Sequence, residues 1–254
     1  MRQISWTVVV TSLSIFVAMQ GCSQDDAACL PVTDEDRPFL LNYPNLEDSD
    51  GKVVLTNEHV VLQRLVVPAG EWEGVHSHPG NQVYVHIHGG VWSGRLGGET
   101  EYSDEFSPDG DVGWMDAIPL SAGHDSGNTG DTDIDLIYVT LKKDAPLTPG
   151  AEPSPQEFPD LELEFVLEND RMIVQRALLE PGQWTGVHQH PGNQVFLVIE
   201  GGIRSERRGG EPFAAETSLD PGSVGWIDTL DSADAHDVGN TGETTMEIVL
   251  VTIK

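Results

Sequence analysis

The sequence predicts an all-β protein in which two domains of the same design follow one another. Three observations support this prediction. Residues 62–142 align without a gap onto residues 174–254, and 36 of the 81 aligned pairs are identical. Within each copy, short runs rich in Val, Ile and aromatic residues alternate with Gly, Pro and Asn turns, which is typical of a sandwich or barrel. Neither copy has a convincing helical period.

Three strand-like runs set the order of elements in each copy. In the first copy they are residues 60–67, ended by Pro68, residues 82–88, ended by a Gly pair, and residues 134–141, which close the domain. Branched and aromatic side chains pack well on a pleated sheet, whereas Gly and Pro interrupt it. Each run is therefore expected to be a strand.

The segment between the copies predicts a linker. Residues 143–155 contain five Pro or Gly residues among 13, and such a composition does not hold regular structure. We expect a Pro-rich linker over residues 144–160, with the first domain over residues 56–143 and the second over residues 161–254. A repeat of this length exceeds a solenoid unit, which favours two whole domains over an array.

The first 22 residues are typical of a signal peptide. Arg2 precedes an apolar run from Ile4 to Met19, which is short for a membrane-spanning helix. The end of this segment resembles a bacterial lipobox, in which the Cys, here Cys22, becomes the lipidated first residue. This resemblance implies a lipoprotein anchored to a bacterial membrane and facing the periplasm, with the outer membrane as the expected location. An uncleaved anchor, or a signal cleaved elsewhere, is the alternative.

Charge and cysteine usage narrow the possible partners. Residues 23–55 are acidic and lack periodicity, so we expect a disordered tether that holds the globular part off the membrane. The formal net charge of −29 and a pI near 4.3 argue against nucleic-acid binding. The only cysteines, Cys22 and Cys29, lie outside both repeats, so no disulfide framework or thiolate metal site supports the fold.

A pattern of histidines recurs at the offset of the repeat, 112 residues. Residues 74–83 read GVHSHPGNQV, and residues 186–195 read GVHQHPGNQV. Two histidines one residue apart on a strand point their imidazoles to the same face. A third His follows 48 residues after the first in both copies. Three neutral imidazoles suit Fe, Mn, Ni, Zn or Cu and leave positions open for water or substrate.

This order of residues resembles the two sequence motifs of the cupin superfamily, present in both copies as in a bicupin. The resemblance implies two tandem cupin (jelly-roll) β-barrels, with up to one divalent transition metal in each. In cupins the ligands are the two His and the Glu of the first motif and the His of the second. Carried over, the metal ligands are His76, His78, Gln82 and His124 in the first barrel, and His188, His190, Gln194 and His236 in the second.

Gln82 and Gln194 stand where cupins carry Glu, and this departure leaves the function open. The change removes a negative charge and a candidate general base; the amide either ligates weakly through its oxygen or leaves a three-His site. Three-His centres resemble those of some cupin dioxygenases, which implies an Fe-dependent, dioxygenase-like enzyme on a small organic substrate, with Mn, Ni, Zn or Cu as alternative metals. The second hypothesis is a non-catalytic metal- or small-ligand-binding lipoprotein, and the third a metal that serves stability alone. No catalytic residue is assigned, and an oligomer is compatible with the sequence.

Three further side chains are candidates for substrate binding. Arg64 and Arg176 match between the copies on the strand before the first motif, where an Arg would clamp a substrate carboxylate; a surface ion pair is the alternative. His86 occurs only in the first copy and alternates onto the face of Gln82, where it would contact substrate or relay protons. A core or rim histidine with satisfied hydrogen bonds is the alternative.

Overall fold

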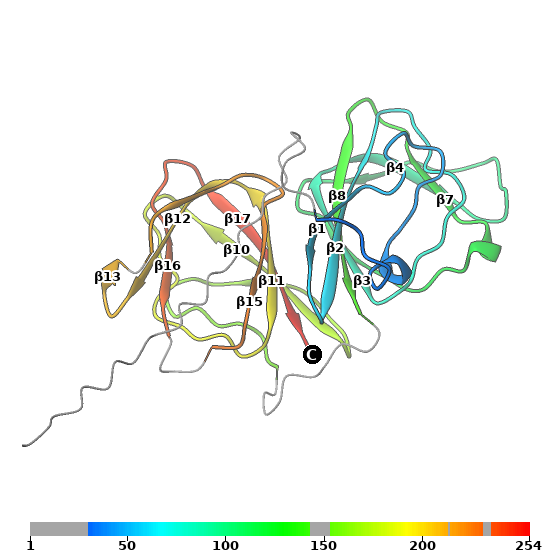
Figure 1. Ribbon diagram of the computed structural model, residues 1–254. Helices are drawn as coiled ribbons and strands as arrows, with labels where there is room; N and C mark the ends of the chain where they lie inside the picture. Colours follow the sequence, from blue (N-terminus) through cyan, green and yellow to red (C-terminus); the bar gives the residue numbers. More distant parts are fainter. Residues whose placement is uncertain (1–29, 143–152, 213, 231–234) are drawn as a thin grey trace, which may run out of the picture.

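Two barrels of antiparallel strands lie side by side in the computed structural model (Figure 1). The structure describes residues 30–142, 153–212, 214–230 and 235–254. Among these residues the only helices are two short 3₁₀ turns, η1 (Arg37–Phe39) and η2 (Leu120–Ala122). The all-β architecture predicted from the sequence is confirmed.

The first barrel consists of a five-stranded sheet facing a three-stranded one. The five-stranded sheet has the order β1 (Lys52–Thr56), β2 (Val60–Val67), β8 (Ile134–Leu141), β3 (Gln82–His88), β6 (Val112–Met115). The three-stranded sheet has the order β5 (Glu105–Ser107), β4 (Gly90–Arg95), β7 (Asp125–Asn128). The Gly, Pro and Asn turns read from the sequence separate these strands, as their chemistry favours.

The second barrel repeats this arrangement. Its five-stranded sheet has the order β15 (Val224–Ile227), β11 (Gln194–Glu200), β17 (Met246–Ile253), β10 (Met172–Leu179), β9 (Glu164–Glu168). The opposite sheet joins β13 (Glu211–Pro212), β12 (Gly202–Arg208) and β14 (Thr217–Leu219), with β16 (Asp237–Asn240) paired to β12. The two copies therefore share one topology.

Alternation along each large sheet gives its two faces different roles. On β3, Val83 and Val85 belong to an apolar cluster that also contains Val195 and Leu197 of β11. The opposite face of β3 carries Gln82 and points into its own barrel. Because successive side chains in a strand point to opposite faces, the two large sheets pack back to back and leave both interiors free to hold a site.

The segment before the first barrel packs against it, which corrects the expected disordered tether for residues 30–55. Leu41, Tyr43 and Leu46 are buried in a cluster with the barrel interior. The buried side chain of Gln63 accepts a hydrogen bond from the Leu41 N–H (2.8 Å) and donates to the Leu41 carbonyl (2.8 Å). A few apolar residues among many acids are sufficient to anchor this segment, which we call the first arm (residues 30–51).

A second arm, residues 153–163, packs on the second barrel in the same way. Gln175 accepts from the Gln156 N–H at 2.7 Å and donates to the Gln156 carbonyl at 3.0 Å. The arms share a short motif, YPNL at residues 43–46 and FPDL at residues 158–161. The motif recurs after 115 residues, not 112, so a gap-free alignment misses it. Of the expected linker, residues 144–152 lie outside the described residues, and residues 153–160 form part of this arm.

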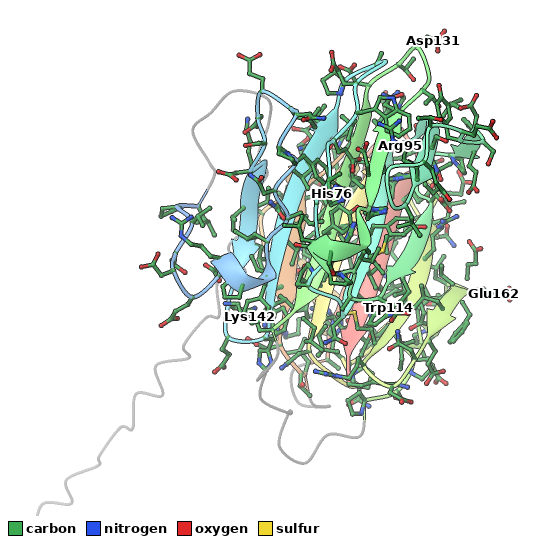
Figure 2. All side chains as sticks on the ribbon, turned by 90° about the vertical axis from the view of Figure 1, so that its right-hand side faces the viewer. His76, Arg95, Trp114, Asp131, Lys142 and Glu162 are labelled. Carbon is green, nitrogen blue, oxygen red and sulfur yellow. The ribbon has the colours of Figure 1, made fainter. Side chains whose placement is uncertain are left out.

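The surface is dominated by acidic side chains, whereas the histidines of the motif lie inside. Figure 2 shows Asp131 and Glu162 at the periphery, where both are exposed, and His76 deep within the first barrel. The predicted signal segment and Cys22 lie outside the described residues. No helix in the described part of the chain is long and apolar enough to cross a membrane.

Candidate metal centres

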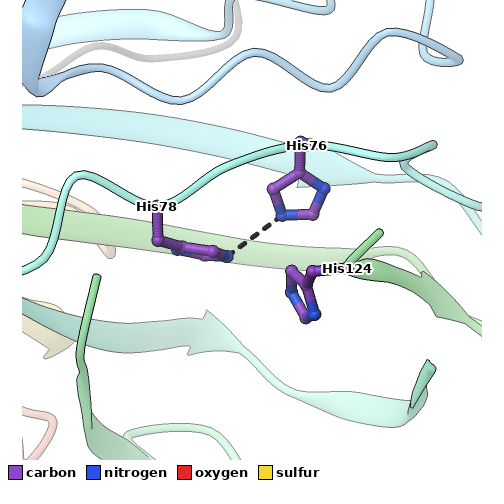
Figure 3. Close-up of side chains that lie close together, drawn as sticks. All are labelled: His76, His78 and His124. Atoms are coloured by element: carbon purple, nitrogen blue, oxygen red, sulfur yellow. Dashed lines mark hydrogen bonds between the residues drawn. The ribbon is translucent and has the colours of Figure 1, made fainter. Parts of the chain in front are cut away.

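The first cluster brings together His76, His78 and His124, whose ligand nitrogens all lie within 4.8 Å of one another (Figure 3). His76 and His78 lie on the connection that leads into β3, and His124 directly precedes β7. Backbone pairing sets this meeting, because the His76 N–H donates to the His124 carbonyl at 3.0 Å. The Nε2 atoms of His76 and His78 are 3.0 Å apart.

The second cluster has the same construction from His188, His190 and His236. His188 and His236 exchange both backbone hydrogen bonds, at 2.8 and 3.0 Å. The Nε2 atoms of His190 and His236 lie 3.1 Å apart. All three side chains are buried. Each barrel thus places three imidazoles, predicted from sequence spacing, around one point.

Oxygen acceptors behind the rings determine which imidazole nitrogen faces the centre. The Nδ1 atoms of His76 and His188 each lie 2.9 Å from a carbonyl oxygen, that of Gly74 and of Gly186 respectively. A carbonyl oxygen only accepts, so Nδ1 carries the proton and the lone pair of Nε2 points into the cluster. This is the tautomer that a metal ion requires.

Gln82 and Gln194 occupy a different position from the one expected of metal ligands. Gln82 Oε1 lies 3.2 Å from His78 Nδ1, and its amide nitrogen donates to the Thr140 hydroxyl at 2.9 Å. Gln194 repeats both contacts, with Oε1 2.7 Å from His190 Nδ1. Since both ends of each amide are occupied behind a ring, the structure places these residues as supports of His78 and His190. Ligation of a metal by Gln82 or Gln194 stays a prediction.

Burial keeps the imidazoles neutral. Removal from water is the largest cause of the lowered pKa of each of the six histidines, because a charged imidazolium loses hydration inside the barrel. It lowers the pKa of His76 to about 4 and those of His78, His190 and His236 to about 3. The pKa values of His124 and His188 are also lowered, again mainly by burial. Neutral imidazoles are the metal-binding form.

The surroundings of the two clusters differ although the clusters match. Where the first barrel carries polar groups, the second carries apolar ones or a hydroxyl. These pairs, first barrel then second, are Glu73 and Thr185, Tyr43 and Phe158, Tyr138 and Leu250, Tyr84 and Phe196, and His86 and Val198. Tyr43 and Phe158 pack at a tilt against His76 and His188, with ring centroids 4.7 and 4.5 Å apart. The arms therefore cover both clusters with an aromatic ring.

Glu73 is a site residue that the sequence did not single out. Its side chain is buried beside the first cluster, and burial raises its pKa to about 7. Its Oε2 lies 3.6 Å from Nε2 of His76. The hydroxyls of Tyr43 and Tyr138 nearby are hydrogen-bonded to each other at 3.1 Å. The signal that would have found Glu73 is its replacement by Thr185 within a largely matching stretch.

The second cluster has a cation nearby. The charge of Arg204 acts to lower the pKa values of His188, His190 and His236. The Arg204 guanidinium forms an ion pair with Glu206. The corresponding residue of the first barrel is Trp92, whose indole N–H donates to Ser107.

Arg64 and Arg176 are placed away from the clusters, between the barrels. Arg64 forms an ion pair with Asp135 and lies against Gly222, where an added Cβ would come within 2.7 Å of its guanidinium. Arg176 donates to the Gly110 carbonyl of the first barrel at 2.6 Å. Their strand positions face outward, to the neighbouring barrel. The expected substrate clamp is corrected to an interface contact.

His86 lies on the interior face of β3, as its alternation with Gln82 predicts, but does not join the cluster. Its ring is 5.6 Å from Tyr84, and Tyr138 lies between Tyr84 and His78. Its buried Nδ1 has no hydrogen-bond partner among the described residues. A substrate or proton role for His86 stays a prediction.

A cavity of about 880 Å³ borders the second cluster. It lies between the second arm and the barrel, and His188 and Phe158 are in its wall. Leu161, Leu163 and Gln175 also line it. The cavity is large enough for a small organic molecule, by the usual size of ligand pockets.

Comparison with known proteins identifies the fold. Residues 175–252 match the family model of the cupin domain. No curated protein matches the sequence. The structure of AerE from Microcystis aeruginosa is similar with a TM-score of 0.57 at 12% identity, over 85% of this chain and 99% of that one. Together with the shared topology of the two copies, these matches confirm two tandem cupin barrels.

Two further solved structures are similar at lower scores. Salicylate 1,2-dioxygenase from Pseudaminobacter salicylatoxidans has a TM-score of 0.49 at 14% identity, over 82% of this chain and 74% of that one. A cupin domain from Bordetella pertussis has a TM-score of 0.33 at 21% identity, over 39% of this chain and 99% of that one.

Proposed function

We propose that the protein binds a divalent transition metal at each histidine cluster and is a metal-dependent, dioxygenase-like enzyme acting on a small organic molecule. The observation that carries the proposal is that each barrel directs three neutral imidazoles to one point, with Nδ1 hydrogen-bonded behind at least two of them. This donor set fits Fe first, and also Mn, Ni, Zn or Cu.

Different residues of the chain would have different roles in such a site. The imidazoles of His76, His78 and His124 would hold the metal in the first barrel, and those of His188, His190 and His236 in the second. Tyr43 and Phe158 place an aromatic ring against His76 and His188. A bound metal would supply open coordination positions for substrate and O₂. In a dioxygenation, both oxygen atoms enter the substrate, which is oxidised as O₂ is reduced, so no external reductant is needed.

Metal analysis and oxygen uptake test this function. We expect the purified full chain to hold up to two equivalents of metal, and each triple His→Ala variant to lose one equivalent while the other remains. With Fe²⁺ bound, O₂ consumption is expected with at least one class among catechols, diketones, flavonols and thiols. A metal-loaded protein that consumes no O₂ with any of these would reject dioxygenase chemistry for them.

The alternative function is a non-catalytic metal- or ligand-binding lipoprotein. The observation in its favour is that Gln82 and Gln194 occupy the position of the cupin carboxylate and are already engaged behind the rings. Tight metal binding without turnover, and no loss of a cellular activity in His76→Ala with His188→Ala, would support this alternative.

We also propose that the protein is exported and lipid-anchored through Cys22, facing the periplasm at the outer membrane. The proposal rests on the apolar run and lipobox-like end of residues 1–22. Incorporation of labelled palmitate into the wild type but not into Cys22→Ala is the expected result. Equal labelling of both would overturn it.

A further inference from the structure

Glu73 is a buried carboxylate without a cationic side chain beside it. Its exposed fraction is 7%. Among the described residues its side-chain contacts are the Ser126 hydroxyl, which donates to Oε2, and the ring of His76. No Lys or Arg of the described chain forms an ion pair with it. A buried charge without a counter-charge is costly, and a metal ion is one way of compensating it.

The carboxylate of Glu73 reaches the first cluster at His76. Oε2 lies 3.6 Å from Nε2 of His76. That nitrogen is the one facing the cluster centre, because Nδ1 is held by the Gly74 carbonyl. Two ligand atoms each about 2.0–2.2 Å from one ion lie roughly 3–3.5 Å apart at usual coordination angles. Relative to His76 the carboxylate therefore stands close to the separation of a coordinating neighbour, and it lies just outside the group formed by the three imidazoles.

The second barrel lacks this group at the matching position. Thr185 replaces Glu73, and its hydroxyl lies 3.1 Å from Nδ1 of His188, on the side away from the cluster. Burial is the largest cause of the lowered pKa values of the three histidines there, and the charge of Arg204 lowers all three further. The two clusters thus share their imidazoles but differ in the charge beside them.

We infer that Glu73 supplies a carboxylate oxygen to the metal of the first cluster, in place of the one that Gln82 does not provide, so that the two barrels bind divalent metal with unequal affinity. The inference rests on the proposed metal binding. It makes the first site a three-His, one-carboxylate centre and the second a three-His centre. The first site then favours harder, oxygen-preferring ions more than the second does.

Titration of the metal-free full chain with Co²⁺, followed by visible absorption, tests this inference. The wild type is expected to bind in two steps that differ at least tenfold in affinity, and His124→Ala should remove the tighter step. Glu73→Gln should weaken the tighter step about 10- to 100-fold, as loss of a metal-supporting group typically does, and change its absorption. Thr185→Glu should strengthen the second step.

Matched controls separate the possible outcomes. Glu71→Gln changes an exposed residue of the same loop and should leave both steps unchanged. Melting of the metal-free proteins should show Glu73→Gln at least as stable as the wild type, because an uncompensated buried carboxylate has been removed. Two steps of equal affinity, unaffected by Glu73→Gln, would overturn the inference and leave the proposed metal binding intact. No Co²⁺ binding by the wild type would overturn both.

Discussion

At the scale of single residues, the orientation of the imidazoles depends on what their outer nitrogens bind. Gln82 and Gln194 each hold one ring through Oε1 and are themselves fixed by a threonine hydroxyl. A ligand His whose other nitrogen is held in this way loses little freedom when the metal arrives. In the proposed metal centres the amides would therefore hold His78 and His190 in the orientation that a metal ion needs.

This support predicts the effect of removing one amide. In Gln82→Leu we expect a 10- to 100-fold loss of metal affinity at the first cluster only, because His78 loses its Nδ1 acceptor. Gln194→Leu should weaken the second cluster only, so each variant is the control for the other. Competition with a chelator of known affinity measures both. A loss of affinity spread equally over both clusters would contradict the assignment.

The lowered pKa values of the histidines predict how the metal-free protein responds to acid. Between about pH 4 and 6.5 the unfolded chain binds protons at these histidines and the folded chain does not. Stability must then fall as the pH falls, by up to about 1.4 kcal/mol per pH unit for each imidazole. Protonation of Glu73 has the opposite effect: between about pH 7 and its ordinary pKa of 4.5 it raises the stability as the pH falls. It is a single group, whereas several histidines lower the stability.

Urea unfolding of the metal-free protein from pH 7 to pH 5 measures this dependence. The variant with His76, His78 and His124 all changed to Gln is the control, because it keeps the second cluster and should show a shallower slope. A wild-type stability that is flat or rises toward pH 5 would contradict the burial of neutral imidazoles.

At the scale of elements, the arms tie chain outside the barrels to the sites. Gln63 satisfies both backbone groups of Leu41 and also donates to the Asp50 carbonyl at 2.7 Å. The arm then brings Tyr43 onto His76. The hydrogen bonds that hold the arm on the barrel therefore also hold Tyr43 on the cluster.

Removal of the hydrogen bonds made by the Gln63 side chain should release the first arm. In Gln63→Leu the buried Leu41 N–H and carbonyl lose their partners, which costs about 1–3 kcal/mol. We expect faster proteolysis within residues 30–50 and lower stability of the first barrel. Gln175→Leu should act on the second arm instead, and leaves residues 30–50 as resistant as in the wild type. Unchanged proteolysis in Gln63→Leu would show that the apolar contacts alone hold the arm.

The sequence predicted the strands and the six histidines but not the arms or the roles of the amides. The histidines were predictable because a gap-free repeat carries them at fixed spacing. The arms were not, because their shared motif is shifted by three residues relative to the barrels and stands among acids that suggest disorder. Whether Gln82 ligates or supports depends on rotation of its side chain, which spacing does not determine.

At the scale of the whole molecule, the two barrels share one apolar core. Val83 and Val85 of the first large sheet and Val195 and Leu197 of the second belong to a single buried cluster. His59 adds a stacked contact across the boundary, 5.1 Å from Trp226. The alternation of side chains along each strand indicates which residues face outward from each barrel. It does not indicate that a second barrel covers those residues. Alternation alone therefore does not place Arg64 and Arg176 at an interface, although the ion pairs considered as the alternative to a substrate clamp are present.

The shared core predicts that the barrels unfold together. Separation would expose apolar surface on both sheets, at a cost of about 25 cal/mol per Å². Calorimetry of the metal-free protein should therefore show one transition whose calorimetric and van't Hoff enthalpies agree. Val85→Asp, which places a charge in the shared core, should split or lower this transition. Two well-separated transitions in the wild type would contradict the prediction.

The back-to-back arrangement has a consequence for how the two halves have diverged since the duplication. On β3 and β11 the residues that face the other barrel remain aliphatic in both copies, as Val83 and Val195 or Ile87 and Ile199 do. Of the interior residues of the same strands, Gln82 and Gln194 are the same, whereas His86 corresponds to Val198 and Tyr84 to Phe196. In each half, the outward residues are constrained by packing against the other barrel, whereas the interior residues are not. Specialisation of one copy therefore needed no change in the surface that joins them.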